Sequence, residues 1–338
     1  MTGTTIARAG KRQRALLGIT AVIALVALSA GATAVGHHLR TSSSNSSVAA
    51  LLGDGGGYVP PSSLTQNTPI APTSVGEPVA TIPDTPPPSA ALSGDHRRDP
   101  RRMRLLLVTA DAGDPSFVAL RSGLAQAGVP NDVLVTATNT LTEATLWDGK
   151  NTGRYQGVVL ASNLLLRPDP ATGQFAPTFS DAEFTLLRAY ERAFGAREVS
   201  VATFPDGNEN TTGLSLLSYD DLESRTESLS LTDGGRKEFS YLNPAAQIPM
   251  RFTRVYRAKP VKDDATTPLL VDRDGHPIVA TTAFADGREA MTITMSFAQN
   301  EMGWLLLQRG VIDWVTKGQY LGELRTTLNV QIDDLFLI

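Results

Sequence analysis

The apolar and polar positions of residues 103–318 predict strands that alternate with helices. Residues 104–109 contain a continuous apolar run, which is typical of a strand covered on both faces. Residues 117–127 carry apolar side chains at helical spacing, with Asp114 or Ser116 as the cap and Gly128 as the stop. Three more strands are predicted at residues 132–136, 156–161 and 198–204. This alternation predicts an α/β domain with a parallel sheet and right-handed crossovers.

The second half of this region adds a helix, two hairpins and a final helix. Ser180 is the predicted cap of a helix that ends at Gly195. Three apolar runs at residues 268–272, 277–284 and 290–297 are separated by Asp274-Gly275 and Asp286-Gly287, two hairpin turns in which glycine accepts a positive φ. Asn300 is the predicted cap of the last helix, and Gly318 ends it.

Residues 205–265 lose this rhythm and are rich in Ser, Thr and Asp. They contain one clear strand-like run, at residues 250–256. We interpret the region as an insertion that either extends the sheet or adds a small β element. Its acid pair Asp220-Asp221, like Asp263-Asp264, is expected in a solvated loop.

The N-terminus, residues 1–40, has the pattern of an export signal, either a signal peptide or a signal anchor. Four basic residues, Arg8, Lys11, Arg12 and Arg14, precede an uncharged run at residues 15–36. Cleavage after the small residues 32–34 and retention as an anchor both remain open, because the run is long enough to span a bilayer core of about 30 Å. Either way the bulk of the chain is expected outside the cell, with any membrane contact made through this segment.

Residues 41–100 are expected to form a disordered linker. They hold ten of the 21 prolines, with serine and glycine runs and little apolar periodicity. Such a composition favours a semi-extended spacer. The basic pairs Arg97-Arg98 and Arg101-Arg102 are expected to be solvated at the domain edge, with contact to anionic wall polymers as the alternative.

Composition excludes several functional classes. A net charge of −4 provides no basic field that would indicate nucleic-acid binding. The chain has no cysteine, which excludes disulfides, thiolate metal ligands and a cysteine nucleophile. None of its four histidines has a sequence partner at ligand spacing, so His96 is expected in the linker and His276 at the surface.

The last residues hold the strongest candidate for chemistry. Residues 328–333 alternate apolar and polar side chains as a half-buried strand does, and the adjacent acids Asp333 and Asp334 follow it. Ligand and catalytic groups collect at such strand ends in barrels and open sheets. The pattern by itself also fits a structural turn. Because residues 335–338 are all apolar, we expect a further domain to begin here.

Two family resemblances extend this interpretation. The order of elements, with Asp286-Gly287-Arg288 before a Trp-containing helix, is similar to the flavodoxin-like and class I glutamine-amidotransferase-like superfamily. That resemblance implies a three-layer sheet domain over residues 101–320, with a β-rich insertion at about 205–265. The catalytic cysteine, a Gly-x-Ser-x-Gly elbow and a phosphate loop at residues 109–114 are all missing, so a non-catalytic support or sugar-binding role is expected.

Residues 331–337, Gln-Ile-Asp-Asp-Leu-Phe-Leu, resemble the opening motif of polysaccharide deacetylases, and most closely the secreted exopolysaccharide deacetylases of the galactosaminogalactan type, a carbohydrate esterase family. The resemblance implies that residues 321–338 begin a truncated (β/α) barrel. By match to the motif, Asp333 is the catalytic general base and Asp334 a ligand of a divalent metal, usually zinc. The implied reaction is metal-assisted hydrolysis of an N-acetyl amide.

The family's His-x-x-x-His metal ligands do not occur in the sequence, and a catalytic zinc needs three protein ligands. The chain is therefore expected to be inactive by itself, as the N-terminal part of a secreted deacetylase of an extracellular N-acetylated amino-sugar polysaccharide. The alternative is a non-catalytic carbohydrate-binding or scaffold module at the cell surface.

Overall fold

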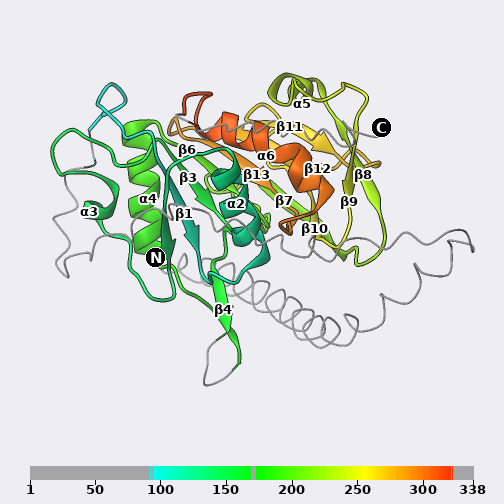
Figure 1. Ribbon diagram of the computed structural model, residues 1–338, viewed down its shortest axis with the longest axis horizontal. Coiled ribbons are helices and arrows are strands. Elements are labelled where there is room, and N and C mark those ends of the chain that lie inside the picture. The colour runs from blue at the N-terminus through cyan, green and yellow to red at the C-terminus, as the bar shows by residue number, and fades with distance from the viewer. Residues whose placement is uncertain (1–91, 93, 169–172, 321, 323–338) are drawn as a thin grey trace, which may run out of the picture. The chain divides into compact units, whose positions relative to one another are not determined.

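The computed structural model describes residues 92, 94–168, 173–320 and 322 (Figure 1). The predicted signal segment, most of the predicted linker and the strand with Asp333 and Asp334 lie outside these residues. Within the described ranges, no helix is both long and apolar enough to cross a lipid bilayer. The chain divides into two compact units, of which residues 74–167 with 177–338 form the larger.

The larger unit is built on a nine-stranded sheet with the order β2-β1-β3-β6-β13-β12-β11-β8-β9. Parallel pairing joins the first five: β2 (Asn131–Val135), β1 (Leu105–Thr109), β3 (Gly157–Leu160), β6 (Arg197–Ser200) and β13 (Glu289–Ile293). Antiparallel pairing adds the other four: β12 (Pro277–Ala283), β11 (Thr266–Val271), β8 (Glu227–Leu231) and β9 (Gln247–Met250). The predicted parallel sheet is therefore only the first half of a mixed one.

Helices cover both faces of the parallel strands (Figure 1). On one face, α2 (Pro115–Gln126) and α6 (Met302–Val315) pack against the side chains of Leu105 and Leu107. On the other, α3 (Glu143–Leu146) and α4 (Asp181–Phe194) pack against Leu106 and Val108. These four apolar side chains of β1 are 0% exposed, and each such burial stabilises the fold by about 1.5–3 kcal/mol. This two-sided burial explains why the strand reads as a continuous apolar run.

Capping residues set the ends of α2 and α4 as predicted. Asp114 Oδ1 accepts a hydrogen bond from the Phe117 N–H at 3.0 Å. At the start of α4, Ser180 and Glu183 form a reciprocal capping box, with the Ser180 N–H donating to Glu183 Oε2 at 2.8 Å. Gly195 ends this helix with a φ of 62°, which glycine adopts without strain.

The insertion both extends the main sheet and adds a small separate β element, the two alternatives left open by the sequence. Strands β8 and β9 extend the main sheet, and the short helix α5 (Asp233–Glu238) packs against β11. Strands β7 (Leu214–Asp221) and β10 (Arg254–Pro260) pair with each other as a separate two-stranded ribbon. The ribbon packs on β12 through Leu214, Ala258 and Ala280. A further two-stranded sheet consists of β4 (Leu166–Pro168) and β5 (Phe175–Pro177).

Three predicted element boundaries are wrong. The run at residues 250–256 is not one strand, because Phe252, with a φ of 53°, lies between the end of β9 at Met250 and the start of β10 at Arg254. The strand predicted at residues 198–204 ends at Ser200, since Ala202 has a φ of 48°. The cap of α6 is Glu301 instead of Asn300, because residues 298–301 form a turn in which the Glu301 N–H donates to the Ala298 carbonyl at 3.1 Å.

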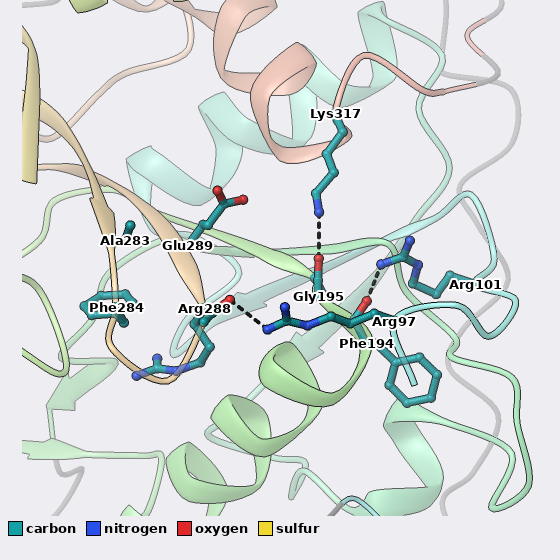
Figure 2. A pocket seen from close by; sticks show the side chains of 11 residues that line it. Arg97, Arg101, Phe194, Gly195, Ala283, Phe284, Arg288, Glu289 and Lys317 are labelled. Carbon is teal, nitrogen blue, oxygen red and sulfur yellow. Dashed lines mark hydrogen bonds between the residues drawn. The ribbon is translucent and has the colours of Figure 1, made fainter. Parts of the chain in front are cut away.

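Three cations converge on the C-terminal end of α4 (Figure 2). Arg97 Nε and Lys317 Nζ donate to main-chain carbonyls of residues 192 and 195 at 3.4 and 2.9 Å, and Arg101 donates to that of Phe194. Arg97 is exposed at the domain edge, as expected, whereas Arg101 is partly buried, so the expectation that it is simply solvated is wrong. Cations stabilise this end of a helix because its free carbonyls carry partial negative charge.

A pair of acids is enclosed between α4 and β6. Glu191 is 1% exposed, and its Oε1 has no hydrogen-bond donor. Burial raises the pKa of the Glu191 carboxyl well above 4.5, and the adjacent Glu198 raises it further, while Arg288 at 3.7 Å acts in the opposite direction. Burial raises the pKa of Glu198 as well, so we expect the pair to retain a proton between the two carboxyls, since ionised carboxylates can only accept hydrogen bonds.

The close approach of α5 to the sheet gives a test of the fold. A Cβ at Gly235 would lie 2.0 Å from the Leu269 carbonyl oxygen, whereas at Gly113 its nearest neighbour would be a side-chain oxygen at 3.5 Å. We expect Gly235→Ala to lower the free energy of unfolding by about 1–3 kcal/mol, the usual cost of overpacking. Urea denaturation of this variant and of Gly113→Ala measures the difference. Equal stability of the two variants would contradict this packing.

The acid pair predicts a pH dependence of stability. The folded state retains a proton that the unfolded chain releases near pH 4.5, so stability falls as the pH rises from 4.5 through the raised pKa. Glu191→Gln removes this titration, and its amide can still donate to Glu198. We expect the melting temperature of the variant to fall less than that of the wild type between about pH 5 and pH 8. Parallel curves for the two proteins would rule out the shared proton.

Candidate functional site

The two residues predicted to carry the chemistry, Asp333 and Asp334, lie outside the described residues. Their roles as general base and metal ligand stay predictions. The described residues instead concentrate polar and aromatic side chains at the carboxyl ends of the parallel strands. In open α/β sheets, ligands bind at this edge, where the strand order reverses.

Loops after three parallel strands meet at that edge. After β1, Asp111 accepts a hydrogen bond from the Gly113 N–H at 2.8 Å, and Asp114 caps α2. After β3, the Asn163 side chain both donates to and accepts from the main chain of Phe204, at 2.9 Å in each case. Phe204 itself follows β6, so the amide of Asn163 ties two strand ends together.

The ribbon adds an aromatic and charged face beside these loops. Tyr256 and Arg254 of β10 lie opposite Tyr219 and Asp221 of β7 in the strand register. Because residues two apart in a strand share a face, all four side chains lie on the same side of the ribbon. The two tyrosine ring centroids are 5.4 Å apart, and Arg254 Nε lies 3.6 Å from Asp221 Oδ2. Phe204 continues the aromatic row, with its ring 5.6 Å from that of Tyr256.

The electrostatics link this face to the β1 loop. Burial raises the pKa of the Tyr256 hydroxyl to about 12, Tyr219 adds to the rise and Arg254 counteracts it. Burial also raises the pKa of Asp114; hydrogen bonds from the main chain of Phe117 lower it, and Arg254 does so as well. Tyr256 is therefore a neutral hydroxyl at physiological pH. Arg254 is the cation that lowers the pKa of both Tyr256 and Asp114.

Phe252 is the exposed aromatic residue of this edge. Its side chain is 57% exposed although its φ of 53° is one that bulky residues rarely adopt. The Phe252 N–H donates to the Glu223 carbonyl at 2.8 Å, and the Arg251 guanidinium lies 4.6 Å from the ring centroid. Strained backbone of this kind concentrates at functional sites. We use the term edge surface for Asp114, Phe204, Tyr219, Asp221, Phe252, Arg254 and Tyr256.

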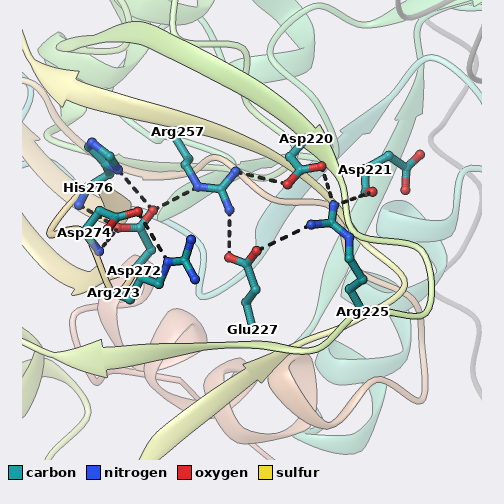
Figure 3. A network of polar contacts seen from close by, with 9 residues as sticks. All are labelled: Asp220, Asp221, Arg225, Glu227, Arg257, Asp272, Arg273, Asp274 and His276. Atoms are coloured by element: carbon teal, nitrogen blue, oxygen red, sulfur yellow. Dashed lines mark hydrogen bonds and ion pairs between the residues drawn. The ribbon is translucent and has the colours of Figure 1, made fainter.

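A network of ion pairs holds the ribbon to the main sheet (Figure 3). Arg257 of β10 lies 2.7 Å from Glu227 of β8, 3.1 Å from Asp272 after β11 and 3.4 Å from Asp220 of β7. Its side chain is only 14% exposed, so these pairs are partly shielded from water. Asp220 and Asp221 are thus strand residues in ion pairs, and the prediction of a solvated loop is wrong for them. Arg225 binds Asp220 from the outer side.

His276 has a partner that the sequence spacing did not indicate. Its Nδ1 lies 3.1 Å from Asp272 Oδ2, and Asp272, Asp274 and His276 bring ligand atoms within 4.8 Å of one another. Burial raises the pKa of Asp272, but hydrogen bonds from the His276 main chain and ring outweigh it, so the net shift is downward. The group does not fit a catalytic divalent metal, since the Arg257 guanidinium already occupies Asp272 Oδ2.

His96 is also part of the folded domain. Its ring stacks on Phe194 with centroids 5.1 Å apart, and its Nδ1 lies 2.7 Å from Asp99. The expectation that it belongs to a linker is wrong for this residue. No periodic signal in residues 94–100 indicated the contact, because it depends on a single ring reaching α4.

Comparisons with known proteins identify the domain. The family model described as Agd3 CBM87 matches residues 102–314, which is more than half of the chain. The chain belongs to the Agd3 CBM87 family. The initials denote a carbohydrate-binding module, and the match covers the α/β domain that includes the edge surface. The deacetylase resemblance is therefore confirmed through this CBM87 domain, although it was inferred partly from the Asp333-Asp334 motif.

One solved structure shares the fold of the CBM87 domain, and others are similar at lower scores. The crystal structure of Agd3, a novel carbohydrate deacetylase, is similar with a TM-score of 0.59 and 24% identity, covering 70% of this chain and 36% of that one. A β-galactosidase from Rahnella sp. R3 gives a TM-score of 0.42 at 13% identity, covering 64% and 32%. A ThuA-like protein from Bacteroides uniformis gives 0.40 at 14%, covering 66% and 92%. No curated protein matches the sequence. The chain thus spans about a third of the length of Agd3.

The network around Arg257 predicts a large loss of stability when its centre is removed. Arg257→Met leaves Glu227 and Asp272 without their guanidinium partner, and breaking a shielded pair from one side costs about 3 kcal/mol. Arg273→Met is the matched control, because that side chain is 83% exposed and its single pair is expected to contribute less than about 1 kcal/mol. Urea denaturation of both variants measures the difference. Similar losses in the two would show that Arg257 does not hold the ribbon.

Proposed function

We propose that the CBM87 domain binds an extracellular N-acetylated amino-sugar polysaccharide through the edge surface. The observation that carries this proposal is the family match over residues 102–314, which includes every residue of that surface. A pyranose ring has an apolar face of C–H groups and a rim of hydroxyl groups. The edge surface offers matching chemistry, since Phe252 presents an exposed ring and Arg254 and Asp221 present charged hydrogen-bonding groups.

The acetyl group adds a second requirement. An N-acetyl substituent combines a small apolar methyl with a neutral amide, so it favours an aromatic contact beside neutral hydrogen-bonding groups. Tyr219 and Phe204 flank the neutral Tyr256 hydroxyl in one aromatic row. A deacetylated sugar would instead carry an ammonium group and would lack both the methyl and the amide that these contacts suit. These contacts favour the acetylated polymer.

We further infer that the chain belongs to an exported, metal-dependent polysaccharide N-deacetylase. The similarity to Agd3, described as a carbohydrate deacetylase, supports this, as do the basic and uncharged segments of residues 1–36. In this proposal Asp333 takes a proton from water and Asp334 helps to hold a divalent metal, zinc by family resemblance. A bound metal would polarise the acetyl carbonyl. A genuine stop codon directly after Ile338 would contradict the proposed enzymatic activity and leave a binding or scaffold module.

The finer description of the fold belongs to the same proposal. The strand order β2-β1-β3-β6-β13 is the second-first-third-fourth-fifth order of flavodoxin-like sheets, which supports that assignment for the parallel half. We place the start of a (β/α) barrel at residues 321–338. The domain would then present the polysaccharide to a catalytic unit that follows it.

Glycan binding by the full chain tests the proposed function. We expect oligosaccharides of N-acetylgalactosamine to bind more tightly than those of galactosamine or galactose in isothermal titration. Phe252→Ala is expected to weaken the binding of the acetylated oligosaccharide about tenfold, as loss of one central aromatic contact does. Tyr219→Ala is expected to act in the same direction.

Leu305→Ala is the control, because this exposed apolar side chain lies on α6 outside the edge surface. Its affinity is expected to stay within about twofold of the wild type. Equal binding of acetylated and non-acetylated oligosaccharides would contradict the proposed preference for an N-acetylated sugar. An unchanged affinity of both aromatic variants would remove the assigned surface.

A further inference from the structure

The opposite edge of the sheet contains a cavity of different chemistry (Figure 2). It has a volume of about 380 Å³ and lies where β6 and β13 begin and β12 ends. Side chains that line it include Arg97, Arg101, Phe284, Arg288, Glu289 and Lys317. Ligand pockets in proteins usually measure about 300–1,000 Å³, so the cavity has room for one sugar residue.

The charges around this cavity are not balanced. Glu289 is already paired with Arg197 at 2.8 Å, and Arg288 with Asp286 at 2.8 Å. Among the described residues, no carboxylate lies within 4.0 Å of the cationic groups of Arg97, Arg101 or Lys317. Three cations therefore face the cavity without a counter-charge from a side chain.

Capping of α4 explains only part of this arrangement. An arginine has five N–H donors and a lysine has three. Arg101 and Lys317 each use one donor on a main-chain carbonyl, and Arg97 uses two, on the carbonyls of residues 192 and 287. The partial charge at a helix end is about half an electron, less than three cations supply. Unused donors and excess positive charge remain at the same place.

The lowered pKa of Lys317 reflects this excess of positive charge. Burial lowers the pKa of its ammonium group, and the nearby guanidinium groups of Arg197, Arg101 and Arg97 lower it further, against a rise caused by Glu289. Its backbone is also held in the left-handed region, with a φ of 55°. A bound anion would relieve the repulsion among these groups.

We propose that this cavity, which we call the cationic pocket, binds one oxyanion group, a carboxylate or a phosphate, carried by a polysaccharide. Guanidinium forks suit either group, because each presents coplanar N–H donors to two oxygens. Phe284 contributes an apolar side chain to the wall, and its ring lies 4.6 Å from the Arg288 guanidinium. The polysaccharide part of this assignment rests on the proposed function, whereas the oxyanion part rests on the three unpaired cations alone.

Isothermal titration of the full chain separates the two parts. At low salt we expect a trimer of galacturonic acid to bind at least about tenfold more tightly than a trimer of galactose, and added salt to weaken only the former. Lys317→Gln and Arg97→Gln are each expected to weaken the binding of the acidic trimer about fivefold, the loss of one charge-assisted hydrogen bond. Lys317→Arg is expected to restore it.

Arg121→Gln is the matched control, since this exposed arginine lies on α2 away from the pocket and the variant removes the same charge. Thermal melting without ligand shows whether each pocket variant still folds, and the salt dependence of the wild type tests the site without any variant. Binding of inorganic phosphate alone, lost in Lys317→Gln, would keep the oxyanion assignment and identify phosphate as the group.

The assignment is overturned if neither anion binds, if the galactose trimer binds as well as the acidic one, or if Arg121→Gln weakens binding as much as Lys317→Gln. Failure of N-acetylgalactosamine oligosaccharides to bind would contradict the proposed function of the edge surface but not the assignment of the cationic pocket. The two proposals can therefore be refuted independently.

Discussion

The parallel pairing of β13 with β6 is the constraint on which the rest of the structure depends. These strands are neighbours in the sheet although residues 201–288 separate them in the chain. The chain between them must therefore leave from the carboxyl end of β6 and return to the amino end of β13, at the opposite edge of the sheet. The antiparallel half of the sheet and the ribbon are this excursion. The edge surface exists because the excursion starts and folds back where the parallel strands end.

Local signals in the sequence were sufficient wherever one residue type determines the backbone. Ser180 and Glu183 define the start of α4, and Gly195 defines its end, because capping and left-handed geometry each need particular side chains. The turns at Gly275 and Gly287, with φ values of 85° and 83°, produced the predicted hairpins for the same reason. The pairing of β8 with β11 could not be inferred in this way, since its partners Leu231 and Leu270 are far apart in the chain and leave no periodic trace in either strand.

The candidate site was much less predictable than the fold. Tyr219 and Tyr256 are ordinary strand residues in sequence, and only the register of the ribbon makes them partners. Arg257 on β10 contacts Glu227 on β8 and Asp272 after β11, so no spacing rule connects them. The sequence around Phe252 predicted the wrong structure, because an aromatic residue within residues 250–256 favours a strand. Tertiary contacts, and not local propensity, turned it into an exposed residue at a bend.

The two edges of the sheet place limits on a common ligand. The edge surface and the cationic pocket are separated by at least the length of β6, which is about 13 Å for four residues at the rise of an extended strand. A single sugar residue cannot contact both. One edge offers aromatic faces and neutral or paired groups, and the other offers cations without a carboxylate partner, so the two proposals assign a neutral sugar and an acidic group to opposite ends. Simultaneous occupancy of both edges by one molecule therefore requires a polymer with several sugar units between its neutral and its acidic contact.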